Sequence, residues 1–398
     1  MGESESSDGN SRAISSQEID SNLWSVKLAD LTGMSRVSKS IPFPAWPPFL
    51  FIGVVYVVSA TLRLLGSSEL DTGTVSQILT TFTAIMFVIS GIYILSRRYA
   101  DTISGIPGSS PEPDIKSSQM GIVDRMMGSV DRLVLGALWS DSESWKNHSA
   151  PPRLRNALVL SAFAIHLTYL FVLGNYSTVV SNRGFISGSF DFLFVIPFVY
   201  YPLIAEFTSI LFNVLLGLPS RVRADRLLTI DDPDGYSGIR PVGSLINTAT
   251  MFYAAGIILY TLNTVVIGRV FGSPVSVIDW AYIAVGTGIG LMIFLYPIMA
   301  LNRIISLQKD SILEEIASRV KETGSDPRFF PATDAEDMET TQRYMQEYIN
   351  MRIIRESHDY PINFRQFLSV FTTLVLPFIL NYFSSTVLPS IVDLLAGS

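Results

Sequence analysis

Seven long apolar stretches, separated by charged segments, constrain this chain more than any other feature of its sequence. Each has about 19 or more residues, enough for a helix rising ~1.5 Å per residue to cross a hydrocarbon core of ~30 Å. Lipid offers the backbone no hydrogen-bond partner, so such a run must be helical. The sequence therefore predicts an all-α fold, a seven-transmembrane helix bundle. The stretches are 47–65, 76–96, 157–180, 190–217, 244–268, 278–301 and 366–389.

The composition fits membrane insertion and removes several kinds of chemistry. Of the 398 residues, 48% are hydrophobic and 16% are charged, whereas soluble domains carry about 25% charged residues. The chain has 0 cysteines, which excludes disulfides, iron–sulfur clusters and thiolate catalysis. His148, His166 and His358 lie far apart and match no zinc spacing. No paired-carboxylate, histidine-cluster or serine-nucleophile constellation lies near the spans, so we expect no enzyme activity, metal or cofactor.

The basic residues are distributed very unevenly between the connecting segments. Segments 1–45, 97–156, 218–243 and 302–365 hold four, eight, four and nine of them, which is 25 of the 28 lysines and arginines. With seven spans these segments share one side, and basic residues accumulate on the cytoplasmic side. We therefore predict a multi-pass protein of the cell membrane with a cytoplasmic N-terminus and an outer C-terminus. This orientation argues against G-protein-coupled receptors and microbial rhodopsins.

The segments around the first spans give part of the domain organisation. Residues 1–45 are predicted to be a disordered or interfacial tail, because the first 23 are polar and lack the apolar core of a signal peptide. Residues 46–301 hold the first six spans. Within them, 97–156 combines a Pro-, Gly- and Ser-rich linker with a pattern over 120–139 that fits an amphipathic interfacial helix. A helix packed on other cytoplasmic helices fits that pattern equally well.

Residues 302–365 predict a cytoplasmic helical hairpin. Its first helix continues the sixth span and ends near Gly324 and Pro327. Its apolar stripe must be covered, either by a second subunit or by the chain's own helices. The stripe is on the second helix of the hairpin, over about 335–357, which carries on one face Met338, Met345, Tyr348, Ile349 and Ile353.

Residues 366–398 then hold the seventh span and the outer C-terminus.

The loop 219–243 contains a cytoplasmic acidic turn formed by Asp231, Asp232 and Asp234. The letters D-x-D-G match the start of an EF-hand loop, but Pro233 interrupts them and no bidentate glutamate follows at the required position. We interpret the turn as structural and expect no metal there. The run PDGYSGIRPVG also resembles a PDG-x-x-G-[LI]-x-P-x-G element that precedes a membrane span in uncharacterised prokaryotic membrane proteins. That resemblance implies no activity.

Two ionisable residues, Glu206 and His166, stand out inside the predicted spans. Such groups are costly in a membrane and mark a functional hypothesis. Each lies about 10 residues from the inner end of its predicted helix, hence ~15 Å from the cytoplasmic boundary. Equal depth makes a hydrogen-bonded Glu206–His166 pair feasible. The pair is interpreted either as a proton- or cation-responsive site or as a structural contact between helices.

Seven spans, a cytoplasmic N-terminus, short outer loops and an extended sixth helix together resemble the insect-chemoreceptor-type seven-transmembrane ion channel superfamily. The resemblance implies a cytoplasmic helical region that assembles tetramers and a last helix that lines the pore. The family's Thr-Tyr…Gln-Phe signature is absent from that helix, and Gln366-Phe367 stands at its start instead. By this resemblance, the pore-lining candidates are Phe371, Thr372, Leu376, Phe378, Asn381 and Phe383.

Three functions follow from these observations and stay open. The first is a channel-like homo-oligomer, a tetramer by the resemblance. The second is a secondary transporter with Glu206 and His166 as its coupling site, although seven spans do not divide into inverted halves. The third is a sensor or scaffold that acts through the cytoplasmic helices. The expected partners are the lipid bilayer and further copies of the chain, and no nucleic acid.

Overall fold

The computed structural model describes residues 22–40, 46–66, 72–104, 129, 149–177, 185–225, 240–262, 277–322, 338–356 and 364–382. All regular secondary structure in these ranges is helical, which confirms the all-α prediction. The interfacial pattern over 120–139, the acidic turn at Asp231, Asp232 and Asp234, and Phe383 lie outside the described residues, apart from the single helical residue Ser129.

Six helical stretches are long and apolar enough to cross a membrane, and they indicate a membrane-embedded protein. Each of them overlaps one of the first six predicted spans, with different ends. The seventh predicted span is helical over Phe364–Tyr382. Its crossing of the membrane stays a prediction, as does the side on which each terminus lies. The six stretches are Pro47–Leu65, Ile78–Ser104, Pro152–Val172, Phe185–Val222, Arg240–Thr261 and Ile283–Arg303.

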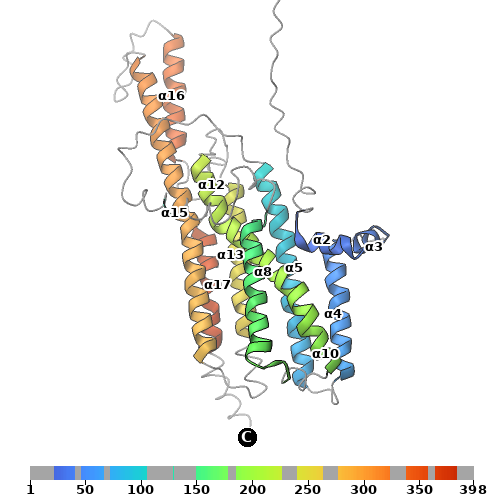
Figure 1. Ribbon diagram of the computed structural model, residues 1–398. Helices are drawn as coiled ribbons and strands as arrows, with labels where there is room; N and C mark the ends of the chain where they lie inside the picture. The colour runs from blue at the N-terminus through green and yellow to red at the C-terminus, as the bar shows by residue number, and fades with distance from the viewer. Residues whose placement is uncertain are drawn as a thin grey trace, which may run out of the picture.

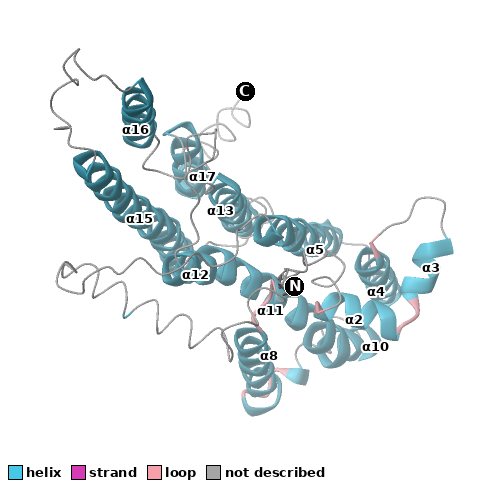
Figure 2. Cartoon of the chain, turned by 90° about the horizontal axis from the view of Figure 1, so that it is seen from above, coloured by secondary structure: helices cyan, strands magenta, loops and turns pink. Residues whose placement is uncertain are grey.

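These stretches belong to helices that stand side by side in one bundle (Figure 1). Seen from above, α4 lies near one edge of the bundle, and α15 and α17 lie near the other (Figure 2). The long helices are α4 (Pro47–Gly66), α5 (Thr72–Ser104), α8 (Pro152–Leu167), α11 (Tyr201–Phe212), α13 (Arg240–Thr261), α15 (Val277–Glu322) and α17 (Phe364–Tyr382).

Two short helices, α2 (Trp24–Leu31) and α3 (Met34–Ser40), precede the bundle and lie across the start of α4 (Figure 1). They fall within the predicted tail, so this part of the tail is folded. Leu23 and Ala29 of this segment are buried in the main core, and that burial stabilises a helix too short to persist alone. Gly33 ends α2 with a φ of 75°, the left-handed conformation that favours glycine.

The fourth predicted span is part of a helical run longer than the sequence indicates. It was expected over 190–217, but the helical residues continue from Phe185 to Asp225. Three of its parts are α-helical and two are π-helical, a form that is rare and concentrates at functional sites. Pro197 lies inside the longer π-helical part, where it supplies no backbone N–H. The parts are α10 (Phe185–Phe190), η3 (Asp191–Tyr200), α11, η4 (Asn213–Gly217) and α12 (Leu218–Asp225).

The predicted hairpin consists of the end of α15 and α16 (Met338–Glu356) (Figure 1). Helix α15 has 46 residues, about 70 Å at ~1.5 Å per residue, so it is far longer than a bilayer core. A small separate core joins the two helices. It contains Ile316 and Ile354 and the half-buried Ile312, Leu313 and Met351.

The core of the bundle is aromatic where α5, α11 and α13 meet. Phe87, Phe207 and Phe252 pack with ring centroids 5.5–6.3 Å apart. Gly91 of α5 allows this approach, because a Cβ there would overlap the Phe207 ring. Helix α15 also packs closely on α13 at Gly286, whose carbonyl accepts a hydrogen bond from Tyr253 (2.7 Å). At Gly288 of the same helix, no atom comes within 4 Å of an added Cβ.

Candidate functional site

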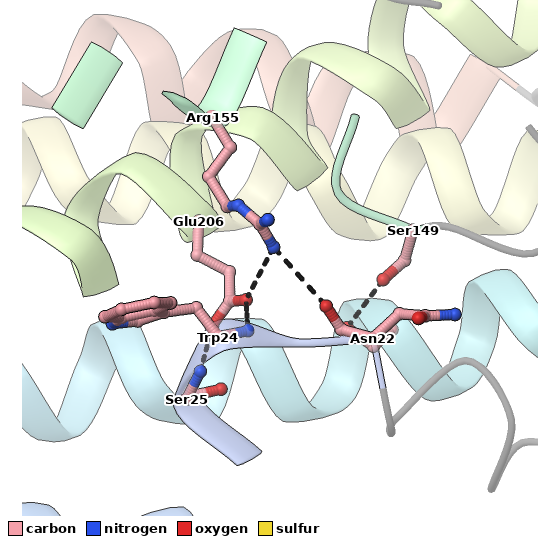
Figure 3. Close-up of polar contacts among 7 residues, drawn as sticks. Asn22, Trp24, Ser25, Ser149, Arg155 and Glu206 are labelled. Carbon is pink, nitrogen blue, oxygen red and sulfur yellow. Dashed lines mark hydrogen bonds and ion pairs between the residues drawn. The ribbon is translucent and has the colours of Figure 1, made fainter. Parts of the chain in front are cut away.

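Glu206 lies at the junction of α11 with the short helix α2 (Figure 3). Its carboxylate is fully buried. One oxygen accepts a hydrogen bond from the backbone N–H of Trp24, and the other accepts from the N–H of Ser25 at 3.1 Å. These N–H groups begin α2 and have no partner within their own helix. The N-cap, Leu23, has no side-chain oxygen to cap them, so a carboxylate from a distant helix caps α2.

Arg155, at the start of α8, completes this contact. Its Nη1 atom lies 3.8 Å from the Glu206 carboxylate and donates to the backbone oxygen of Asn22 at 3.3 Å. Figure 3 shows the guanidinium between Glu206 and Asn22. Four segments thus meet around one buried charge: the residues before α2, α2 itself, α8 and α11. We call Glu206, Arg155 and the start of α2 the α2 latch.

His166 lies elsewhere and is not joined to Glu206. Its Nε2 atom lies 2.7 Å from the backbone oxygen of Phe192, and its Nδ1 atom is hydrogen-bonded to the Tyr201 hydroxyl at 2.9 Å. The described residues contain no hydrogen bond between His166 and Glu206. The ring is nearly buried and bridges α8 to η3 and α11.

Glu206 and His166 were expected at equal depth, and this prediction is wrong because the two helices do not end where the sequence indicated. The third span begins at Pro152 rather than at 157, and the fourth continues past 217 to Asp225. In the actual antiparallel register, Arg155 faces Glu206, and His166 faces Tyr201. At ~1.5 Å per residue, Glu206 lies roughly 30 Å from Phe185. It lies beside Arg155, close to the start of the Pro152–Val172 stretch.

A second buried charge occurs near the N-terminal end of the same helical run. Asp191, the first residue of η3, is 1% exposed. Its Oδ2 atom lies 2.5 Å from Nε of Arg63, and its Oδ1 atom accepts from the Ser59 hydroxyl at 2.5 Å. Both partners are on α4, so this contact joins α4 to η3. Sequence reasoning missed it, although Asp191 and Arg63 are ionisable residues inside predicted spans, the same signal that identified Glu206.

Two apolar cavities flank α5 and α11. The larger, about 650 Å³, lies between α5, α11, α13 and α15, and Phe87, Phe252 and Ile293 are among its lining residues. The smaller, about 440 Å³, lies between α5 and η3, where Arg63 and Tyr200 form part of its wall. Neither Glu206 nor His166 lines either cavity. Surfaces of this kind suit hydrocarbon better than a hydrated ion.

Five of the six pore-lining candidates, all except Phe383, lie on α17, which packs against α13 and α15. Phe371 and Thr372 are exposed, and Leu376 and Phe378 are half-buried. The side chain of Asn381 is not described. The described residues contain no group of three or more histidines, aspartates or glutamates that could hold a metal ion.

No protein-family model, no curated protein and no solved structure matches this chain. The resemblance to the chemoreceptor-type channels therefore stays a prediction.

Proposed function

We propose that this membrane-embedded protein is a channel-like homo-oligomer of the cell membrane, in which α17 of each copy faces a shared axis. The hairpin of α15 and α16 joins the copies on the cytoplasmic side. The observation that carries the proposal is an exposed apolar stripe on α16, on the part of the molecule that extends beyond the bundle (Figure 1).

The stripe faces away from the hairpin's own core. Met345, Tyr348, Ile349 and Ile353 are 45–56% exposed and follow the spacing of one helix face. Met351 and Ile354 occupy the other face and pack on α15. The sequence left two ways to cover the stripe, a second subunit or the chain's own helices. The chain's own α15 covers Met351 and Ile354, which are not part of the stripe. An apolar stripe outside the bilayer is expected to be covered by protein, and a second copy supplies an identical stripe for a symmetric interface.

Helix α17 lies at the same edge of the molecule as α15 and α16 (Figure 2). Leu368, Phe371, Ile379 and Tyr382 are 44–64% exposed along it. Copies joined through α16 would bring these faces of α17 towards one another. A ring of Thr372 hydroxyls and Phe371 rings has the polar and aromatic character of a narrow conduction path, in which a hydrophobic constriction gates by excluding water.

The transporter hypothesis receives less support. It needs Glu206 and His166 to act together, and each has other partners within the protein. The two large cavities are apolar and exclude both residues from their walls. The sensor or scaffold hypothesis places an unrelated protein on the α16 stripe, and the oligomeric state of the purified protein distinguishes it from our proposal.

Single-cysteine variants test the proposal directly, because the chain has 0 cysteines. In liposomes, Thr372→Cys is expected to lose ion flux when a charged thiol reagent reacts with it, and to form disulfide-linked dimers under oxidation. Val57→Cys on α4, 60% exposed near the opposite edge, is the matched control, and its flux should not change. A monomeric protein, or flux that is insensitive to modification at 372, would contradict the proposal.

The assembly surface has its own test. Ile353→Asp puts a carboxylate on the stripe and is expected to convert the oligomer to monomers in detergent. Ser318→Asp puts the same charge on exposed α15, away from the stripe, and should leave the oligomer intact. Mass photometry reports both outcomes. An oligomer that survives Ile353→Asp would mean that other surfaces hold the copies together.

A further inference from the structure

A third cavity, of about 310 Å³, lies beside the α2 latch and has no role in the proposed function. Arg155 and Asn156 of its lining are at the start of the membrane-spanning stretch Pro152–Val172, where a span is expected to meet the membrane surface. The cavity opens between α2, α8 and α11. Its lining residues are Trp24, Arg155, Asn156, Val159, Leu160 and Pro202.

The lining changes from polar to apolar along α8. Arg155 and Asn156 are in the first turn after Pro152, and Val159 and Leu160 follow one turn further into the bundle, about 6 Å deeper at ~1.5 Å per residue. Leu160 is 70% exposed, so the apolar end opens on the surface that contacts lipid. A molecule that fits this cavity has a polar head at Arg155 and an apolar chain along Leu160.

Arg155 keeps donors available for such a head. Its contacts with Glu206 and Asn22 both use Nη1, so Nε and Nη2 have no partner in the described part of the chain. The planar guanidinium binds phosphate oxygens in pairs. Exposed Lys27 follows Trp24 by one turn of α2, on the same side of that helix. Arg155 and Lys27 therefore place positive charge near the mouth of the cavity.

We propose that this cavity binds the phosphodiester head of an anionic phospholipid from the leaflet on the side of α2, with an acyl chain along Val159 and Leu160. The Trp24 indole covers the head from the α2 side, as tryptophan does at membrane interfaces. Basic pockets between membrane helices have the chemistry that anionic heads require. Since Arg155 also belongs to the α2 latch, the bound lipid and α2 share one guanidinium.

Brominated lipids test the proposal through the fluorescence of Trp24. Two titrations are compared in nanodiscs of phosphatidylcholine, one with increasing brominated phosphatidylglycerol and one with increasing brominated phosphatidylcholine. The signal of Trp24→Phe is subtracted to isolate the contribution of Trp24. We expect half-maximal quenching at about fivefold lower mole fraction for the anionic lipid, the preference of one basic residue at an anionic surface. Equal quenching by the two lipids overturns the proposal.

Two variants and one control complete the experiment. Arg155→Gln removes the charge, and Val159→Phe fills the cavity without altering the latch, so both should abolish the preference. Arg98→Gln removes an arginine of α5 that donates to Thr248 and lies outside the cavity, and it should retain the preference. If both cavity variants still prefer brominated phosphatidylglycerol over brominated phosphatidylcholine, the proposal is wrong. Inorganic phosphate that displaces the anionic lipid at millimolar concentration would assign the site to a soluble anion instead.

Discussion

Glu206 and Asp191 are two fully buried carboxylates on one helical run, and they are stabilised in different ways. Asp191 is paired with the full charge of Arg63 and with one hydroxyl, both on α4. Glu206 accepts two backbone N–H groups from the start of α2, and its arginine is 3.8 Å away. The first contact joins two helices of the bundle, and the second holds the short helix α2 against the bundle.

The difference shows two ways of burying a negative charge in a membrane protein. An ion pair cancels the charge with another whole charge, so loss of either partner leaves the other buried alone. A helix start offers only about half an elementary charge, spread over N–H groups that need acceptors in any case. We therefore expect Asp191 to matter for the whole bundle and Glu206 to matter mainly for α2.

The largest expected effect comes from Asp191→Ala. It leaves the Arg63 guanidinium, whose side chain is only 12% exposed, without its counter-charge, and we expect about 3–5 kcal/mol of lost stability. The free energy of unfolding in detergent measures this loss. The double variant Arg63→Met with Asp191→Leu removes both charges and is the control, because an apolar replacement of the whole pair is often close to neutral. A loss below about 1 kcal/mol in the single variant would mean that Arg63 finds solvent.

Gly91→Ala is expected to have the next largest effect. The new methyl overlaps the Phe207 ring, and overpacking of this kind costs about 1–3 kcal/mol. Phe207 follows Glu206 directly, so α2 should loosen while the Arg63–Asp191 contact is unchanged. Gly288→Ala is the matched control: it has open space around it and should stabilise its helix by about 0.5–1 kcal/mol. Hydrogen exchange resolved along the chain separates the two regions.

Glu206→Gln should act locally. The amide oxygen keeps one of the two N–H partners, but its NH₂ group opposes the other, and an unsatisfied buried donor costs about 1–3 kcal/mol. The amides at the start of α2 should exchange about tenfold faster or more, while those of α4 and α5 keep their rates. Asp310→Asn, an exposed carboxylate on α15, should change nothing. Global unfolding of Glu206→Gln would remove the distinction between the two carboxylates.

Much of the fold is predictable because apolar length alone specifies a membrane helix. The first six spans and the extension of the sixth helix follow from it. The ends of helices do not, since a span can continue as a helix into water without any change of backbone pattern. The register between α8 and α11 depended on those ends, and this is why Glu206 and His166 were expected to meet.

The site was only partly predictable for a related reason. An ionisable residue inside a predicted span suggests a functional site, and this rule identifies Glu206 and His166. Applied up to the ends of the spans, it also identifies Asp191 and Arg63. The rule does not predict which groups these residues bind. Glu206 is bound by backbone N–H groups of Trp24 and Ser25, and any residue type other than proline provides such a donor. The need for Gly91 depends on where the Phe207 ring lies, which only the packed structure defines.

The smallest expected effect, from Arg155→Gln, decides what holds α2. The Arg155–Glu206 contact, at 3.8 Å, is longer than a hydrogen bond, and the Glu206 carboxylate keeps both N–H groups of α2, so removal of the charge should cost less than about 1 kcal/mol. In nanodiscs of phosphatidylcholine alone, where no anionic lipid contributes, the first amides of α2 should exchange only a few-fold faster, well below the increase in Glu206→Gln. Equal increases in the two variants would mean that the ion pair, rather than the capped helix start, fastens α2 to the bundle.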